Sequence, residues 1–89
     1  MNADDRWSME VFVAEIDGET DAEARLAKAD NRHFSGRGTA RLDPANRDVG
    51  VIGEEIAIAR ALSDLSHKLL HSAAVGVESM THEGARLHR

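Results

Sequence analysis

The chain has 89 residues, which is the length of a single domain. It contains no cysteine, which excludes a disulfide framework and a cysteine-ligated zinc site. The formal net charge is −5, and no apolar run approaches the roughly 20 residues of a membrane-spanning helix. The acidic start at Asp4 and Asp5 lacks the order of a signal peptide, so we expect a cytoplasmic protein with no membrane contact.

Residues 7–14 carry apolar side chains at a period of two, the pattern of a strand. The odd positions, which we expect to face the core, are Trp7, Met9, Val11 and Val13. Asp17-Gly18 follows this segment and predicts a tight hairpin turn, because both residue types tolerate a positive φ.

Residues 21–27 continue the alternation with Ala22, Ala24 and Leu26 on the inward side. Residues 19–29 also contain good helix formers, so a helix is an alternative for this segment. The hairpin turn and the alternation agree with each other, and together they favour a second strand.

Residues 34–42 predict a third strand, whose even positions face the core. Two of these positions are Gly36 and Gly38, which would leave a shallow trough that lets a helix backbone approach closely. Asp43-Pro44 ends the strand, because proline donates no ladder hydrogen bond.

A long amphipathic helix is predicted after Gly53, which can cap it, and ends near Ala74, with Gly76 as the residue just past its end. Its apolar stripe consists of Ile58, Leu62, Leu65, Leu69 and Ala73. The opposite side carries Arg60, Asp64, His67 and His71, and Asp64 can pair there with Arg60 or with Lys68. We expect residues 77–89 to form a partly mobile tail, which leaves residues 1–76 as one β-β-β-α domain.

These elements predict an α+β fold of two layers, a three-stranded antiparallel sheet covered on one face by one long helix. The uncovered face would carry a possible interaction surface, made of Phe12, Arg25, Arg37 and Arg41. Neighbouring segments of the chain differ in charge: residues 1–24 hold eight acids and one arginine, whereas residues 25–47 hold six basic residues and two acids. Acids and arginines can therefore pair across strands.

Few residues offer catalytic or metal chemistry. His67 and His71 have the i, i+4 spacing of zinc ligands, but Lys68 stands where a metalloprotease motif needs glutamate, and a solvated polar face explains them better. Gly36-Arg37-Gly38 lacks the third glycine of a dinucleotide fingerprint. We expect no catalytic residue, no metal ion and no cofactor.

Three runs carry a resemblance to a known family: Arg41-Leu42-Asp43-Pro44-Ala45-Asn46-Arg47-Asp48, Ile52-Gly53-Glu54-Glu55-Ile56-Ala57 and Ala59-Arg60-Ala61-Leu62-Ser63-Asp64-Leu65. They resemble a family of small actinobacterial proteins of unknown function that are described as having a double-stranded-RNA-binding-domain-like fold. The resemblance implies a two-layer α+β fold and implies no activity or site residue.

We expect a non-enzymatic interaction module that forms a homodimer or binds another protein, since so short a chain has a thin margin of stability. The alternative is a protein that binds double-stranded RNA through the basic segment from Arg25 to Arg47. A metal sensor that uses His67 and His71 is a third and weaker possibility.

Overall fold

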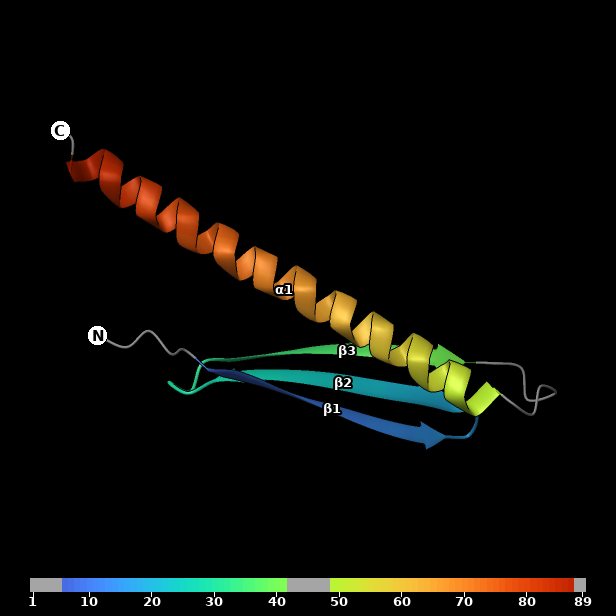
Figure 1. The fold of residues 1–89 in the computed structure, drawn as a ribbon. Helices are drawn as coiled ribbons and strands as arrows, with labels where there is room; N and C mark the ends of the chain where they lie inside the picture. The colour runs from blue at the N-terminus through green and yellow to red at the C-terminus, as the bar shows by residue number, and fades with distance from the viewer. Residues whose placement is uncertain (1–5, 42–48, 88–89) are drawn as a thin grey trace.

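The computed structural model describes residues 6–41 and 49–87, which form three strands and one helix (Figure 1). The elements are β1 (Trp7–Ile16), β2 (Glu19–Lys28), β3 (His33–Arg41) and α1 (Val49–Leu87). The strands form one antiparallel sheet in the order β1-β2-β3, and α1 lies across one face of it. This is the two-layer α+β architecture that the sequence predicts.

A two-residue turn fixes the register between β1 and β2. Asp17 and Gly18 both have positive φ, 52° and 80°, as a tight hairpin requires. Ile16 therefore pairs with Glu19, and the ladder continues to Trp7 opposite Lys28. Residues 21–27 lie within β2, so the helical alternative for this segment is wrong.

Small residues dominate the core. The buried apolar residues are Ala22, Ala24, Ala40, Ala57, Ala61 and Leu65. A Cβ placed on Gly36 would collide with the carbonyl oxygen of Ala61, and one placed on Gly38 would collide with that of Ala57. The two glycines form the predicted trough, and the backbone of α1 lies directly in it.

The helix differs from its predicted bounds. It begins at Val49, four residues before the predicted cap at Gly53, and it continues through Gly76 to Leu87. An interior glycine costs a helix only about 1 kcal/mol, so Gly76 does not stop it. The predicted domain boundary at residue 76 thus falls inside a continuous helix; the mobility of residues 77–89 stays a prediction. Asp43-Pro44 lies outside the described residues.

The buried line along α1 also differs from the predicted stripe. It runs through Ala57, Ala61 and Leu65, whereas Leu62 is exposed. The reason is the glycine trough, because the closest approach of helix and sheet requires alanine rather than a large side chain at the crossing. Ile58 and Leu69 flank this line and are partly buried.

The helix is narrower and longer than the sheet. It packs on β3 and β2 and barely touches β1. Its 39 residues span about 58 Å, against about 33 Å for a strand of ten residues. Consequently, β1 is left uncovered and the C-terminal half of α1 projects beyond the sheet (Figure 1).

Candidate interaction surface

The outer edge of β3 is closed by three side chains of α1. Arg60 donates a hydrogen bond from Nη1 to the carbonyl oxygen of Thr39 at 2.7 Å. The backbone N–H of Arg37 donates to Oδ2 of Asp64 at 2.9 Å. Lys68 donates from Nζ to the carbonyl oxygen of Ser35, also at 2.9 Å. We call Arg60, Asp64 and Lys68 the edge cap.

The edge cap follows from matching repeats. Four helical residues rise about 6 Å, and two strand residues span about 6.6 Å, so side chains at i, i+4 and i+8 stay in step with every second residue of a strand. Alternate residues of an edge strand direct their N–H and C=O groups outward. The helical periodicity predicts Arg60 and Asp64 on the side of the helix opposite the core. That expectation is wrong, because this row of α1 lies along the β3 edge.

Asp64 is the charged centre of the edge cap. Its Oδ2 also accepts a hydrogen bond from Lys68 at 3.0 Å, which confirms one of the two predicted i, i+4 pairs; Arg60 binds Thr39 instead. The backbone N–H of Arg37, followed by the ammonium group of Lys68, lowers the pKa of Asp64 below its usual range. The carboxylate is therefore held in the ionised form that accepts both bonds.

The outer edge of β1 is open. The turn at Asp17-Gly18 makes Ile16 and Glu19 a hydrogen-bonded pair, so the even residues of β1 bond to β2 and the odd residues direct their backbone groups outward. No segment within residues 6–41 and 49–87 pairs with this side of β1. Ten residues of edge strand are thus available for further backbone pairing.

Apolar side chains accompany the open edge. All ten residues of β1 are exposed. On the face toward α1, the exposed fractions are 40% for Trp7, 48% for Met9, 41% for Val11 and 38% for Val13. We call these four residues the apolar strip. Long, apolar and exposed edge strands are unusual in proteins that do not pair them.

Two cations of β2 lie over the aromatic rings of β1. The guanidinium carbon of Arg25 is 4.6 Å from the centre of the Phe12 ring, on the outer face of the sheet, which is the face away from α1. On the opposite face, Nζ of Lys28 is 5.6 Å from the centre of the Trp7 ring. Both aromatic residues of β1 therefore present a positive charge beside an apolar ring.

The residues predicted as an interaction surface share the outer face of the sheet, as the strand register requires: Phe12, Arg25, Arg37 and Arg41. Two of the arginines are paired there, Arg25 with Glu23 at 3.1 Å and Arg41 with Glu19 at 3.3 Å. Their role in binding stays a prediction.

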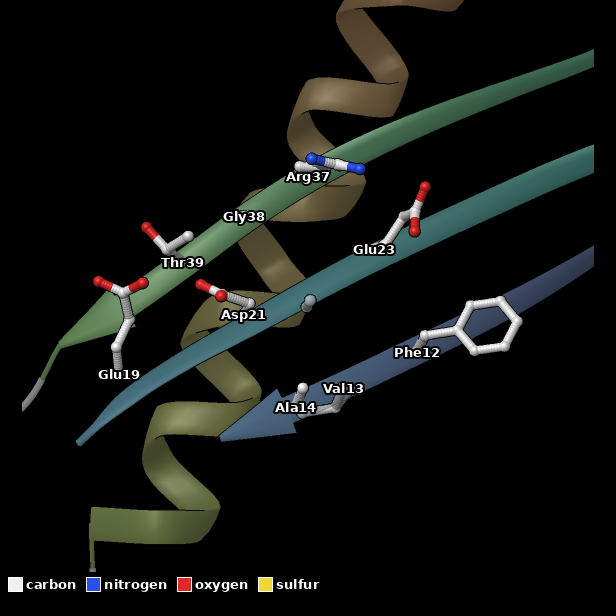
Figure 2. Close-up of a pocket in the computed structure, with 10 residues that line it drawn as sticks. Phe12, Val13, Ala14, Glu19, Asp21, Glu23, Arg37, Gly38 and Thr39 are labelled. Carbon is white, nitrogen blue, oxygen red and sulfur yellow. The ribbon is translucent and has the colours of Figure 1, made fainter. Parts of the chain in front are cut away.

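A shallow hollow of about 500 Å³ lies on the same face (Figure 2). It is lined by the carboxylates of Glu19, Asp21 and Glu23, with Arg37 and Phe12 at its sides. Burial raises the pKa of Asp21, and the charge of Glu19 adds to the effect. The hydrogen bond from Arg25 lowers the pKa of Glu23. The hollow thus combines an acid that resists ionisation with one that favours it.

The two helix histidines form no metal centre in the part of the chain that the structure describes. Nδ1 of His67 is 2.9 Å from the carbonyl oxygen of Ser63, a bond within the helix. No group of three or more potential metal ligands is found among the described residues. Likewise, none of the described helix is apolar enough over 18 residues to cross a membrane.

Residues 5–86 match the sequence profile of the Rv2632c-like family. The chain belongs to the Rv2632c-like family. It is 47% identical to "Uncharacterized protein Rv2632c" of Mycobacterium tuberculosis over 75 residues, 84% of this chain and 80% of that relative. It is 42% identical to "Uncharacterized protein Mb1767" of Mycobacterium bovis over 81 residues, 91% and 85% of the two chains.

The Rv2632c-like family also includes a solved relative. The crystal structure of Rv2632c matches this fold with a TM-score of 0.80 and 43% sequence identity, covering 91% of this chain and 95% of that chain. The expectation of a small actinobacterial family is thus confirmed to the extent that the matched relatives are uncharacterized mycobacterial proteins, whereas the double-stranded-RNA-binding-domain-like fold stays a prediction.

Sequence reasoning missed both edges of this Rv2632c-like sheet. The edge cap has a visible signal, three residues of alternating charge at a spacing of four: Arg60, Asp64 and Lys68. That pattern is also typical of a solvated helix face, and for this reason it does not by itself predict contacts with a strand. The open edge has no such signal, because apolar alternation in residues 7–13 predicts burial.

Proposed function

We propose that this Rv2632c-like protein is a non-enzymatic protein-interaction module that binds its partner through β1. The observation that carries the proposal is the contrast between the two edges of the sheet. The edge cap closes β3 with three hydrogen bonds between that strand and side chains of α1, whereas β1 keeps an open edge beside an apolar strip.

An open edge strand binds a partner strand by backbone hydrogen bonds, and neighbouring side chains supply the specificity. The apolar strip suits this role because Met9, Val11 and Val13 would lose exposed area when a second strand lies beside them. The proposal involves backbone groups and apolar side chains, and it needs neither a cofactor nor a catalytic residue. We place this activity in the cytoplasm.

Nucleic-acid binding through the outer face has less support. Arg25 and Arg41 are paired with glutamates of β2, and the net charge of −5 opposes a polyanion. A double-stranded-RNA-binding-domain-like relationship remains an expectation about the fold, and RNA binding by the segment from Arg25 to Arg47 remains the alternative. It predicts a salt-sensitive gel shift that Arg37→Glu abolishes.

A photo-crosslinking experiment tests the proposal. A benzophenone amino acid replaces Val11 in one variant of the full chain and Thr39 in another, and both variants are irradiated in the cells that express them. Thr39 is exposed and lies on the β3 edge, where the edge cap blocks strand pairing. We expect a covalent protein adduct from position 11 and none from position 39.

A proline variant provides the control. Val13→Pro removes an outward N–H without breaking a hydrogen bond to β2, and proline is tolerated on edge strands. The adduct at position 11 should be lost in this background. Equal adducts from positions 11 and 39, no adduct at all, or an adduct that survives Val13→Pro would each contradict binding through β1.

A further inference from the structure

We infer that the partner of β1 is β1 of a second copy, paired antiparallel about a two-fold axis through Val11. This inference rests on the proposed function and names its partner.

The need to close the open edge of the sheet favours a second copy as the partner of β1. Within residues 6–41 and 49–87, the sheet of each chain has one open edge and one capped edge, so pairing of the two β1 strands closes both open edges at once. The result is a six-stranded antiparallel sheet whose two outer strands are both β3, each closed by its own edge cap. Such a two-fold contact ends at two chains and does not propagate into a fibre.

The apolar strip can pair with the apolar strip of a second copy that runs in the opposite direction. With Val11 on the axis, Val11 faces Val11 of the second copy, and Met9 faces Val13 of the second copy. These odd residues are the ones whose backbone groups point outward, so each of these pairs can exchange hydrogen bonds in both directions. Cross-strand apolar pairs of this kind stabilise antiparallel sheets.

Charge selects the same register. Glu10 then lies opposite Phe12 of the second copy, beside the Arg25 guanidinium that covers that ring. Glu15 lies opposite Trp7 of the second copy, beside the Lys28 ammonium that covers that ring. Both acids of β1 thus face an aromatic residue that carries a cation.

Neighbouring registers lack this match. An axis through Glu10 places two Glu10 carboxylates opposite each other, and like charges in such pairs are destabilising. An axis through Phe12 moves Glu10 opposite Ala14 and Glu15 opposite Met9, which separates both acids from the cations of the second copy. The axis through Val11 is therefore the register that the residues of β1 favour.

Light scattering after size exclusion tests whether the partner is a second copy of the chain. We expect a mass of two chains for the full-length protein at micromolar concentration, and an unchanged mass for Val11→Thr, which keeps the N–H group. Val11→Pro removes both N–H groups of the central pair and should weaken the dimer at least about tenfold. If Val11→Pro fails to fold, as circular dichroism would show, Val11→Lys takes its place, because it sets two ammonium groups opposite each other on the axis.

Disulfide formation tests the register of the two β1 strands. The chain has no native cysteine, so any disulfide must join the introduced residues. Hydrogen-bonded opposite residues have Cα atoms about 5.5 Å apart, within disulfide range, so Val11→Cys should form covalent dimers under mild oxidation. The control is Glu15→Cys, whose two copies would lie about 27 Å apart along the strands and should not crosslink. Covalent dimers of Phe12→Cys in place of Val11→Cys would overturn the register.

The outcomes separate this inference from the proposed function. A single-chain mass, or a two-chain mass that neither Val11→Pro nor Val11→Lys changes, overturns pairing of β1 with itself. If, in addition, the photo-adduct at position 11 has a mass other than two chains, the proposed function stands and its partner is a different protein. If that adduct is absent, both fail.

Discussion

At the scale of single residues, the fold depends on the absence of side chains at the helix–sheet crossing. Gly36 and Gly38 face Ala57 and Ala61, and the backbones are too close for a Cβ between them. Close packing of this kind leaves no room for relaxation, because the obstructing atoms belong to helix backbone.

Gly36→Ala should therefore destabilise the protein by about 3 kcal/mol, the upper part of the range for overpacking. Gly76→Ala makes the same chemical change in the helix where the added methyl group meets open space, and it should stabilise by about 1 kcal/mol. Urea denaturation of both variants measures the difference. Equal effects of the two substitutions would contradict a backbone contact at Gly36.

Asp21 gives a residue-scale test of electrostatics. Because its pKa is raised in the folded state, the folded protein binds its proton more tightly than the unfolded chain does. Its contribution to stability is present below about pH 4 and is lost as the pH rises through the folded pKa. Asp21→Asn should therefore raise the melting temperature at pH 7, and the gain should vanish in acid. The carboxylate of Glu23 has a lowered pKa, so Glu23→Gln should lower the melting temperature at pH 7.

At the scale of elements, α1 does two things for the sheet. Its buried line covers β2 and β3, and its edge cap satisfies the outward backbone groups of β3. The same helix leaves β1 without a cover, since it contacts that strand only slightly. One element thus decides which edge of the sheet is closed and which is open.

Asp64→Ala should lower the melting temperature at neutral pH, because it leaves the N–H of Arg37 without its acceptor. The pKa of Asp64 is lowered in the folded state, so its contribution is present above about pH 4 and is lost as the pH falls through the folded pKa. The difference from wild type should therefore shrink in strong acid. Ser66→Ala, an exposed neighbour on the helix, serves as control and should change little at either pH.

Opening the edge cap should also change the assembly. In the triple variant Arg60→Ala, Asp64→Ala and Lys68→Ala, both edges of the sheet are available for pairing. We expect light scattering to detect species larger than two chains that grow with concentration. If the folded triple variant keeps the wild-type mass, the edge cap does not limit assembly.

At the scale of the whole molecule, the shape is a short sheet with a long rod, 66 Å in its longest dimension. Contacts between α1 and the core extend as far as Leu69, and residues 70–81 of the helix are exposed. The projecting half therefore adds length without adding to the core.

Deletion of residues 73–89 should leave a folded protein whose melting temperature falls by only a few degrees and whose oligomeric state is that of the full chain. Circular dichroism and light scattering measure the two effects. A longer deletion that begins at Leu65 is the matched comparison, and it should unfold the chain because it removes a buried leucine and Lys68 of the edge cap. Loss of association after the shorter deletion would place the contact on the projecting helix.

The sequence by itself determined the local elements and their inward sides. Alternation in β1, β2 and β3 is a property of neighbouring residues. The positive φ of Gly18 follows from its lack of a Cβ, and that of Asp17 from the tolerance of aspartate for such turn positions. The glycine trough was predictable for the same reason. The ends of α1 were not predictable from the sequence. The residues on both sides of Gly53 and Gly76 favour a helix strongly enough that neither glycine ends it.

Only the tertiary structure decided which apolar residues are covered. Alternation shows that Met9 and Ala24 lie on one face, but burial depends on whether another element reaches them. A helix is about 10 Å across, whereas a sheet of three strands is about 14 Å wide, so one strand must lie at the margin. The glycines of β3 let α1 pack closest to that strand, and β1 is left uncovered, as the surface at which we propose that a partner binds.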